Sequence, residues 1–296
     1  YHERLSIAGN CRMCLVEVVG GPPKPSASCA MQVKDLRPSP EGQPPVIKTN
    51  SPMVRKAREG VMEFLLINHP LDCPICDKGG ECPLQNLTME HGKGETRIYY
   101  RAKKHMDNHV PLGELIWLDR ERCIQCARCI RFQDEIVGDD VLAFHERGRR
   151  LQIITHSEPG FDTYFSGNTT DICPVGALTT GDFRFGARPW ELTEVPSISP
   201  WDAAGENISL STRIDRDFGG KTMIKRVMPR QNEFVNEIWI SDKTRFGHHF
   251  TRSDSRLMKP LSGGNDSNWN IVTRAVSDAI KLDTFPKIVP IADSRK

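Results

Sequence analysis

The chain has 296 residues, which is long enough for two or more compact units. Its 40 Lys and Arg residues nearly balance its 38 Asp and Glu residues, so the net charge of +2 provides no strong field for nucleic acid. The longest apolar run, residues 61–67, contains Glu63 and is far shorter than the roughly 18 residues that would indicate a membrane-spanning helix. We therefore expect no nucleic-acid partner and no membrane span.

The ten cysteines are clustered along the chain rather than scattered. Their share of the residues is far below the roughly 8–10% that characterises small disulfide-rich scaffolds. Each cluster contains a C-x2-C pair, which in a long chain with an ordinary remainder indicates metal binding in a reducing compartment. The three clusters are Cys11, Cys14 and Cys29; Cys73, Cys76 and Cys82; and Cys123, Cys126, Cys129 and Cys173.

The first cluster lies close to the start of the chain. Residues 15–19, directly after Cys14, form an apolar run that predicts a strand, and a second short strand is expected at residues 30–33, after Cys29. Small and polar residues around Cys11 leave backbone N–H groups free to point at sulfur, which is one way to tune a cluster. Three thiolates are one ligand short of a [2Fe–2S] centre, which needs four.

The second cluster lies in a loop rich in proline and glycine, with the spacing H-x3-C-x2-C-x5-C. An amphipathic helix is predicted over residues 52–68, with Ser51 as its N-cap and Pro52 at its first position. Four nitrogen and sulfur ligands of this kind suit either Zn²⁺ or an iron–sulfur cluster, and the local spacing does not choose between them. The candidate ligands are His69, Cys73, Cys76 and Cys82.

The segment that follows the loop is polar and loosely patterned. A short strand is expected at residues 98–100, and residues 101–113, including their basic start, are expected to be solvated surface. His91, His105 and His109 show no ligand spacing and are expected to be exposed.

The third cluster carries the strongest signal in the sequence. Cys123, Cys126 and Cys129 form the C-x2-C-x2-C run of bacterial ferredoxins, and the cysteine that precedes a proline in such proteins stands further along as Cys173-Pro174. Zinc sites rarely use this spacing, so the four cysteines predict a [4Fe–4S] cluster. The neighbouring cations are expected to stabilise the reduced cluster at this site; they are Arg122, Arg128 and Arg131.

Cysteine is absent after residue 187, where the composition changes. This tail contains no G-x-G-x-x-G and no P-loop, so it predicts no nucleotide site. The elements expected from residue 127 onward are a helix at 127–137 that ends at Gly138, strands at 150–155, 208–214 and 222–227, and an amphipathic helix that begins at Ser267.

Taken together, these motifs resemble the family of large iron–sulfur subunits of respiratory NADH:quinone oxidoreductase (complex I), known in bacteria as the G subunit. The resemblance covers nearly the whole chain, and runs of this length are highly specific. They are residues 1–14, 58–82, 122–132, 171–178, 187–191 and 239–246.

The resemblance implies three clusters. His69, Cys73, Cys76 and Cys82 match a His-ligated [4Fe–4S] site, and Cys123, Cys126, Cys129 and Cys173 match a second [4Fe–4S] site. Cys11, Cys14 and Cys29 match three ligands of a [2Fe–2S] site, whose earliest cysteine would fall immediately before Tyr1. We therefore expect the chain to be a fragment, and we expect these three cysteines to bind the [2Fe–2S] cluster only in the intact protein.

The expected fold class is multidomain α+β. Its four parts are a truncated β-grasp [2Fe–2S] ferredoxin-like unit at residues 1–50, a [4Fe–4S] unit with one histidine and three cysteine ligands at 51–112, a [4Fe–4S] ferredoxin-like unit at 113–186 and the start of a molybdopterin-oxidoreductase-like α/β domain at 187–296.

The implied function is electron relay from NADH, through a flavin on a partner subunit, toward quinone. This chain would carry no NADH site and no catalytic residue. It would be peripheral, on the cytoplasmic side of a bacterial inner membrane or the matrix side of a mitochondrial one. One alternative is the electron-input portion of an NAD-linked formate dehydrogenase or hydrogenase, but the chain has no contiguous C-x2-C-x2-C-x3-C-P motif. The other alternative is a zinc-stabilised interaction module that has no redox role.

Overall fold

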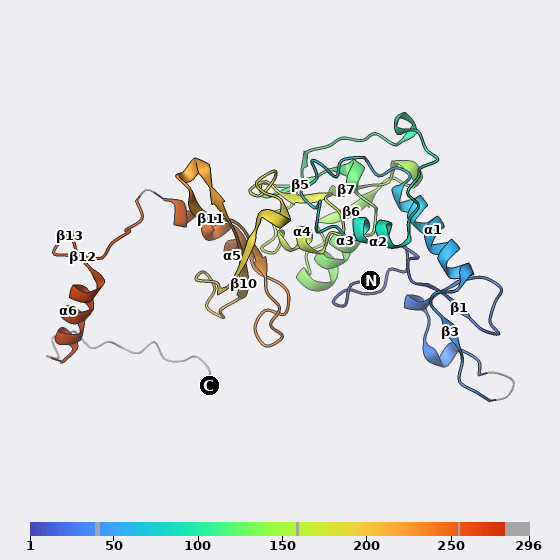
Figure 1. The fold of residues 1–296 in the computed structure, drawn as a ribbon, viewed down its shortest axis with the longest axis horizontal. Coiled ribbons are helices and arrows are strands. Elements are labelled where there is room, and N and C mark those ends of the chain that lie inside the picture. The colour runs from blue at the N-terminus through green and yellow to red at the C-terminus, as the bar shows by residue number, and fades with distance from the viewer. Residues whose placement is uncertain (39–41, 158–159, 254, 282–296) are drawn as a thin grey trace. The chain divides into compact units, whose positions relative to one another are not determined.

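The computed structural model describes residues 1–38, 42–157, 160–253 and 255–281. Short helices alternate with small sheets, and every strand pair in these described ranges is antiparallel (Figure 1). The chain divides into two compact units, Tyr1–His248 and His249–Lys296. Helices and antiparallel sheets together agree with the mixed α/β content that the sequence predicts.

A three-stranded sheet, ordered β2-β1-β3, surrounds the first cysteine cluster. The strand predicted after Cys14 is confirmed, whereas the strand predicted at residues 30–33 is wrong. Two 3-10 turns occupy that stretch, because the Asp35 carboxylate accepts a hydrogen bond from the Gln32 N–H at 3.1 Å and closes the chain locally. The strands are β1 (Leu15–Val18), β2 (Ser26–Ala27) and β3 (Ile47–Lys48).

Helix α1 (Pro52–Leu66) packs against β1 and begins as predicted. The Ser51 hydroxyl accepts a hydrogen bond from the Val54 N–H, and the helix buries Val54 and Met62 completely. Helix α2 (Pro83–His91) is not predicted from the sequence, because Pro83 continues a loop rich in proline and glycine. Pro83 instead occupies the first helical position, where its missing N–H removes no hydrogen bond.

The main hydrophobic core lies under a three-stranded sheet, ordered β4-β5-β8. The helix predicted at residues 127–137 is confirmed as α3 (Arg128–Phe132) and a π-helical turn (Gln133–Val137), which ends at Gly138 in the left-handed region. A 3-10 turn replaces the strand predicted at residues 98–100. The other elements here are β4 (Val110–Pro111), β5 (Ile116–Leu118), α4 (Asn168–Ile172), β8 (Leu178–Thr180) and a hairpin of β6 (Leu142–His145) with the predicted β7 (Gln152–Thr155).

The last part of the first unit is an antiparallel meander, ordered β11-β10-β9, with α5 (Asp242–Phe246) against β11. Both predicted strands are confirmed and are longer than expected. Ile208, Val227 and Ile240 form a separate small core. The strands are β9 (Thr193–Ile198), β10 (Asn207–Asp215) and β11 (Lys221–Pro229).

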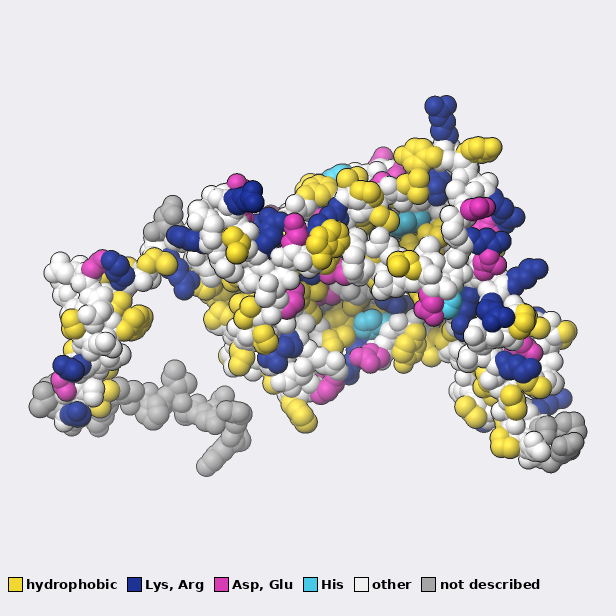
Figure 2. Space-filling view, in the orientation of Figure 1, with side chains coloured by type: hydrophobic (Ala, Val, Ile, Leu, Met, Phe, Trp, Pro, Cys, Tyr) yellow, Lys and Arg dark blue, Asp and Glu magenta, His cyan; other side chains and the backbone are white. Residues whose placement is uncertain are grey.

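The second unit contains the hairpin of β12 (Leu261–Ser262) and β13 (Asn265–Asp266), followed by α6 (Trp269–Lys281), which confirms the helix expected from Ser267. Among the described residues, none of the helices is both long and apolar enough to cross a bilayer. Acidic and basic side chains are interspersed over the face drawn in Figure 2, which agrees with the small net charge.

A buried carboxylate joins α5 to the turn before α4. Asp242 accepts hydrogen bonds from the backbone N–H groups of Ser166 and Gly167, at 2.9 and 2.8 Å, and from the Ser166 hydroxyl at 2.6 Å. Burial raises the pKa of Asp242, although these donors favour the ionised form. The meander is thus attached to the segment that leads to Cys173.

We expect Asp242→Ala to destabilise the chain by about 2–4 kcal/mol, because it leaves buried N–H groups without acceptors. Asp162→Ala, at an exposed position of the same segment, serves as the control and is expected to change stability by less than about 0.5 kcal/mol. Denaturant unfolding followed by circular dichroism measures both values. Equal stabilities of the two variants would contradict the role of Asp242.

Candidate metal centres

His69, Cys73, Cys76 and Cys82 line one cavity of about 550 Å³. Successive turns fold the ligand loop around it, because the N–H groups of residues 75, 76 and 79 each donate to the carbonyl three residues earlier, at 2.9, 3.4 and 2.9 Å. Gly80 has a φ of +99°, in the region that favours glycine. The structure therefore brings the four predicted ligands together.

The donor set of this cavity fits a bound inorganic group. His69 Nδ1 is buried and has no hydrogen-bond partner among the described residues. Burial, together with Lys103 and Arg122, lowers the pKa of His69 to about 4, so its imidazole is neutral at neutral pH and can act as a ligand. A neutral imidazole and three free thiols are donors that suit an iron–sulfur cluster or zinc.

The main chain of His69 is held by a residue that the sequence did not indicate. Lys103 Nζ donates hydrogen bonds to the carbonyls of Leu66, Ile67 and His69 at 2.9, 3.2 and 2.9 Å. The expectation that Lys103 is solvated is wrong, because its ammonium group satisfies carbonyls left free at the end of α1. Only the tertiary structure shows this role.

The second predicted set, Cys123, Cys126, Cys129 and Cys173, is also brought together. Cys129 lies in α3, Cys173 follows α4, and these two helices pack on each other. Burial, with smaller effects of the neighbouring Cys173 and Cys126, raises the pKa of Cys123 to about 12. Burial and the other three sulfurs likewise raise the pKa of Cys129.

The loop of this second set is shaped by unusual backbone angles. Gln125 and Ala127 have φ values of 57° and 59°, in the left-handed region that non-glycine residues seldom adopt. This conformation directs the Gln125 N–H toward Cys123 Sγ at 3.4 Å. Four free thiols, all at least half-buried, with a backbone N–H group aimed at sulfur fit a [4Fe–4S] cluster.

In the first cysteine cluster, Cys14 Sγ and Cys29 Sγ lie 3.2 Å apart, well beyond the roughly 2.05 Å of a disulfide bond. Cys11 lies near enough to raise the pKa of Cys29, although Cys14 has the larger effect. The three predicted [2Fe–2S] ligands are therefore neighbours. Of the histidines expected to be exposed, His105 and His109 are exposed and His91 is half-buried.

The His69 site and the Cys123 site are in direct contact. Gly176, three residues after Cys173, is so close to the His69 site that a Cβ atom there would lie 2.1 Å from Cys76 Sγ. Cys82 Sγ lies 3.5 Å from the Pro174 carbonyl oxygen. Arg122, the residue before Cys123, lines the His69 cavity. Gly176 belongs to the motif at residues 171–178, but only the structure shows why a residue without a side chain stands there.

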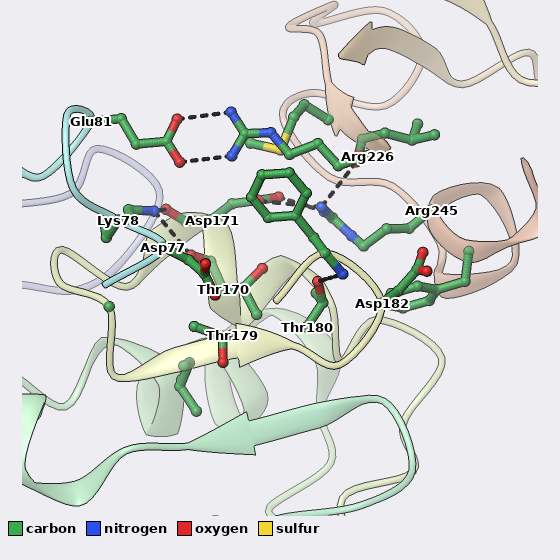
Figure 3. A pocket seen from close by; sticks show the side chains of 16 residues that line it. Asp77, Lys78, Glu81, Thr170, Asp171, Thr179, Thr180, Asp182, Arg226 and Arg245 are labelled. Carbon is green, nitrogen blue, oxygen red and sulfur yellow. Dashed lines mark hydrogen bonds and ion pairs between the residues drawn. The ribbon is translucent and has the colours of Figure 1, made fainter. Parts of the chain in front are cut away.

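The meander is tied to both ligand segments by ion pairs. Arg226 on β11 forms a two-bond pair with Glu81, at 2.7 and 2.8 Å, directly before Cys82. Arg245 on α5 pairs with Asp171, two residues before Cys173. Figure 3 shows these pairs around a small pocket, where Lys78 also donates to the Thr170 carbonyl at 3.1 Å. These side chains hold β11 and α5 against the two ligand segments.

Three family models match separate parts of the chain. Residues 58–97 match the NADH-ubiquinone oxidoreductase-G iron–sulfur binding region, and residues 113–179 match the ferredoxin-like domain of NADH-quinone oxidoreductase subunit 3. Residues 192–249 match the 4Fe–4S domain of NADH-ubiquinone oxidoreductase NDSU1/NuoG-like proteins, although this stretch contains no cysteine.

Curated relatives extend this similarity over the whole chain. The chain is 46% identical to the G subunit of NADH-quinone oxidoreductase of Rickettsia conorii, covering 99% of this chain and 42% of the relative. It is 52% identical to the mitochondrial 78 kDa subunit of NADH-ubiquinone oxidoreductase of Neurospora crassa, covering 88% of this chain and 33% of the relative. The chain belongs to this family of large iron–sulfur subunits. It spans about two fifths or less of the length of these relatives.

Membership of this family means that iron–sulfur binding domains are present in the chain. A solved structure of an NAD⁺-reducing [NiFe]-hydrogenase is also similar, with a TM-score of 0.52 and 27% identity, covering 63% of this chain and 76% of that one. The family models describe ferredoxin-like and 4Fe–4S domains, and the structural neighbour shares part of the fold.

We expect Lys103→Met to lower stability by about 2 kcal/mol, because carbonyls at the end of α1 lose their buried donor. Lys104→Met is the control, since Lys104 is the next residue in the chain and its side chain is only half-buried. Denaturant midpoints measure the difference. Similar midpoints for the two variants would show that the Lys103 ammonium does not hold this helix end.

Proposed function

We propose that the chain is the cluster-bearing part of an electron relay with two [4Fe–4S] clusters. One would be held by His69, Cys73, Cys76 and Cys82, and the other by Cys123, Cys126, Cys129 and Cys173. The observation that carries the proposal is the buried, unpartnered His69 Nδ1 at a cavity that the three cysteines also line, among the residues that the structure describes. Cys11, Cys14 and Cys29 would supply three ligands of a [2Fe–2S] cluster, completed by a fourth residue outside this sequence.

Bound iron–sulfur clusters supply one-electron transfer without making or breaking substrate bonds. The residues of the chain do the remaining work. The apolar core around Cys129 and Cys173 excludes water from one site. Backbone N–H groups such as that of Gln125 point toward sulfur and favour a more negative, reduced centre. Gly176 and Arg122 fix one ligand set against the other, which sets the distance between the two sites.

The position of the chain in the relay follows from its relatives. Their names describe oxidoreductases that connect NADH to quinone or ubiquinone. We propose that electrons enter from a flavin- and NADH-binding partner subunit and leave toward quinone through other subunits of a peripheral membrane-associated arm. The four-part division at residues 1–50, 51–112, 113–186 and 187–296, the last of molybdopterin-oxidoreductase type, belongs to the same proposal.

The alternative is the electron-input portion of an NAD-linked hydrogenase or formate dehydrogenase. The similarity to an NAD⁺-reducing [NiFe]-hydrogenase supports a shared architecture at 27% identity. Identities of 46% and 52% to NADH-quinone and NADH-ubiquinone oxidoreductase subunits favour the first proposal.

Metal analysis tests the proposal directly. Anaerobically purified chain is expected to contain about eight irons with matching acid-labile sulfide, and two [4Fe–4S] signals in low-temperature EPR after reduction with dithionite. Zinc without sulfide, in a colourless protein, would refute the relay and support the interaction module.

Gly176→Ala is expected to remove one cluster selectively. The new methyl group would occupy the position of Cys76 Sγ, so about four irons and one EPR signal should be lost while the Cys123 site remains filled. Gly60→Ala is the control. Gly60 lies inside α1, and a Cβ atom at this position would meet no other atom within 4 Å. Full iron content in Gly176→Ala would contradict the assignment of Cys76 as a ligand.

A further inference from the structure

We propose that Arg122 is a positioning residue of the His69 centre, and that it raises the reduction potential of that centre rather than that of the Cys123 centre beside it in sequence. This inference rests on the proposed function. It reverses the expectation from the sequence, in which Arg122 was grouped with Arg128 and Arg131 at the Cys123 site.

Arg122 is held in place from two sides. Its Nε atom donates to the Asp72 carboxylate at 3.1 Å, and its Nη1 atom donates to Asp119 at 3.0 Å. Asp119 is itself buried and is fixed by Arg184 at 3.1 Å and by the His109 N–H at 3.0 Å. The side chain of Arg122 is only 4% exposed, so its charge is fixed and weakly screened.

The direction in which the Arg122 side chain points determines which of the two centres it affects. Arg122 lines the cavity of His69, Cys76 and Cys82, and its partner Asp72 directly precedes Cys73. The guanidinium charge of Arg122 therefore lies beside the proposed ligands of the His69 centre.

The Cys123 site has other cations. Arg128 and Arg131 line a different cavity, together with Cys126 and with Cys11 and Cys29 of the first cluster. Arg128 donates to the Ile172 carbonyl at 3.2 Å, directly before Cys173. The arginines of one sequence motif therefore point to two different centres.

The charge balance explains the effect on potential. Asp72, Asp119, Arg122 and Arg184 form a network of two acids and two bases with no net charge. Reduction by one electron adds one negative charge to a cluster, and a fixed positive charge beside the cluster favours that state. The electron comes from an external reductant and no bond changes, so removing Arg122 leaves the network negative and disfavours reduction.

The test is an EPR-monitored redox titration of the chain in its native complex, with Arg122→Gln and Arg128→Gln as matched variants. Arg122→Gln is expected to lower the midpoint potential of the His69 centre alone, and Arg128→Gln that of the Cys123 centre alone. The signal lost in Gly176→Ala identifies the His69 centre. A shift of only the Cys123 centre in Arg122→Gln, or no shift, would overturn the inference.

The Asp72→Asn variant distinguishes an electrostatic effect on the midpoint potential from a structural one. It breaks the same ion pair as Arg122→Gln, but it removes a negative charge instead of a positive one. It is expected to raise the midpoint potential of the His69 centre, opposite to Arg122→Gln, whereas a purely structural role would move both variants in the same direction and overturn the proposal. If the Arg122→Gln variant does not assemble with its clusters, the direction of the midpoint-potential shift in Asp72→Asn alone tests the proposal. Absence of both EPR signals from the unsubstituted chain would instead refute the proposed function.

Discussion

The close contact between Gly176 and Cys76 is the constraint on which the arrangement of the two candidate centres depends. A Cβ atom at residue 176 would lie 2.1 Å from Cys76 Sγ, so glycine lets the segment after Cys173 pack against the other ligand loop without displacing that sulfur. The Cys82 sulfur beside the Pro174 carbonyl strengthens this contact. The two sites are therefore parts of one packed structure, and their separation is a property of the fold rather than of a flexible linker.

Ion pairs extend this packing to the meander of β9, β10 and β11. Buried pairs add little net stability over apolar packing, but breaking one leaves an uncompensated charge. The pairs Arg226–Glu81, from β11, and Arg245–Asp171, from the adjoining α5, each reach a residue within two positions of a proposed ligand. Their geometry therefore specifies where the ligand loops lie, and the cysteine-free meander acts as a support for the two centres.

Local signals predicted much of this structure, and long-range contacts account for the rest. The spacing of Cys123, Cys126 and Cys129 is a local property, as is the cap at Ser51, and both were readable from the sequence. The burial of Lys103 depends on carbonyls more than thirty residues away, so its basic surroundings were misleading. The position of Arg122 at the His69 cavity was not predicted for the same reason, because sequence adjacency to Cys123 says nothing about the direction of a long side chain.

The buried thiols connect the fold to its proposed cofactors. Burial raises the pKa of Cys123 to about 12 and raises that of Cys129 as well, so the chain alone keeps these sulfurs protonated and neutral. Four thiolates at such a site would repel one another in a medium that solvates charge poorly. Iron supplies the positive charge that makes deprotonated sulfur stable there, and binding must release the thiol protons. The same burial that excludes water from a relay centre therefore makes its ionised ligand set depend on the metal.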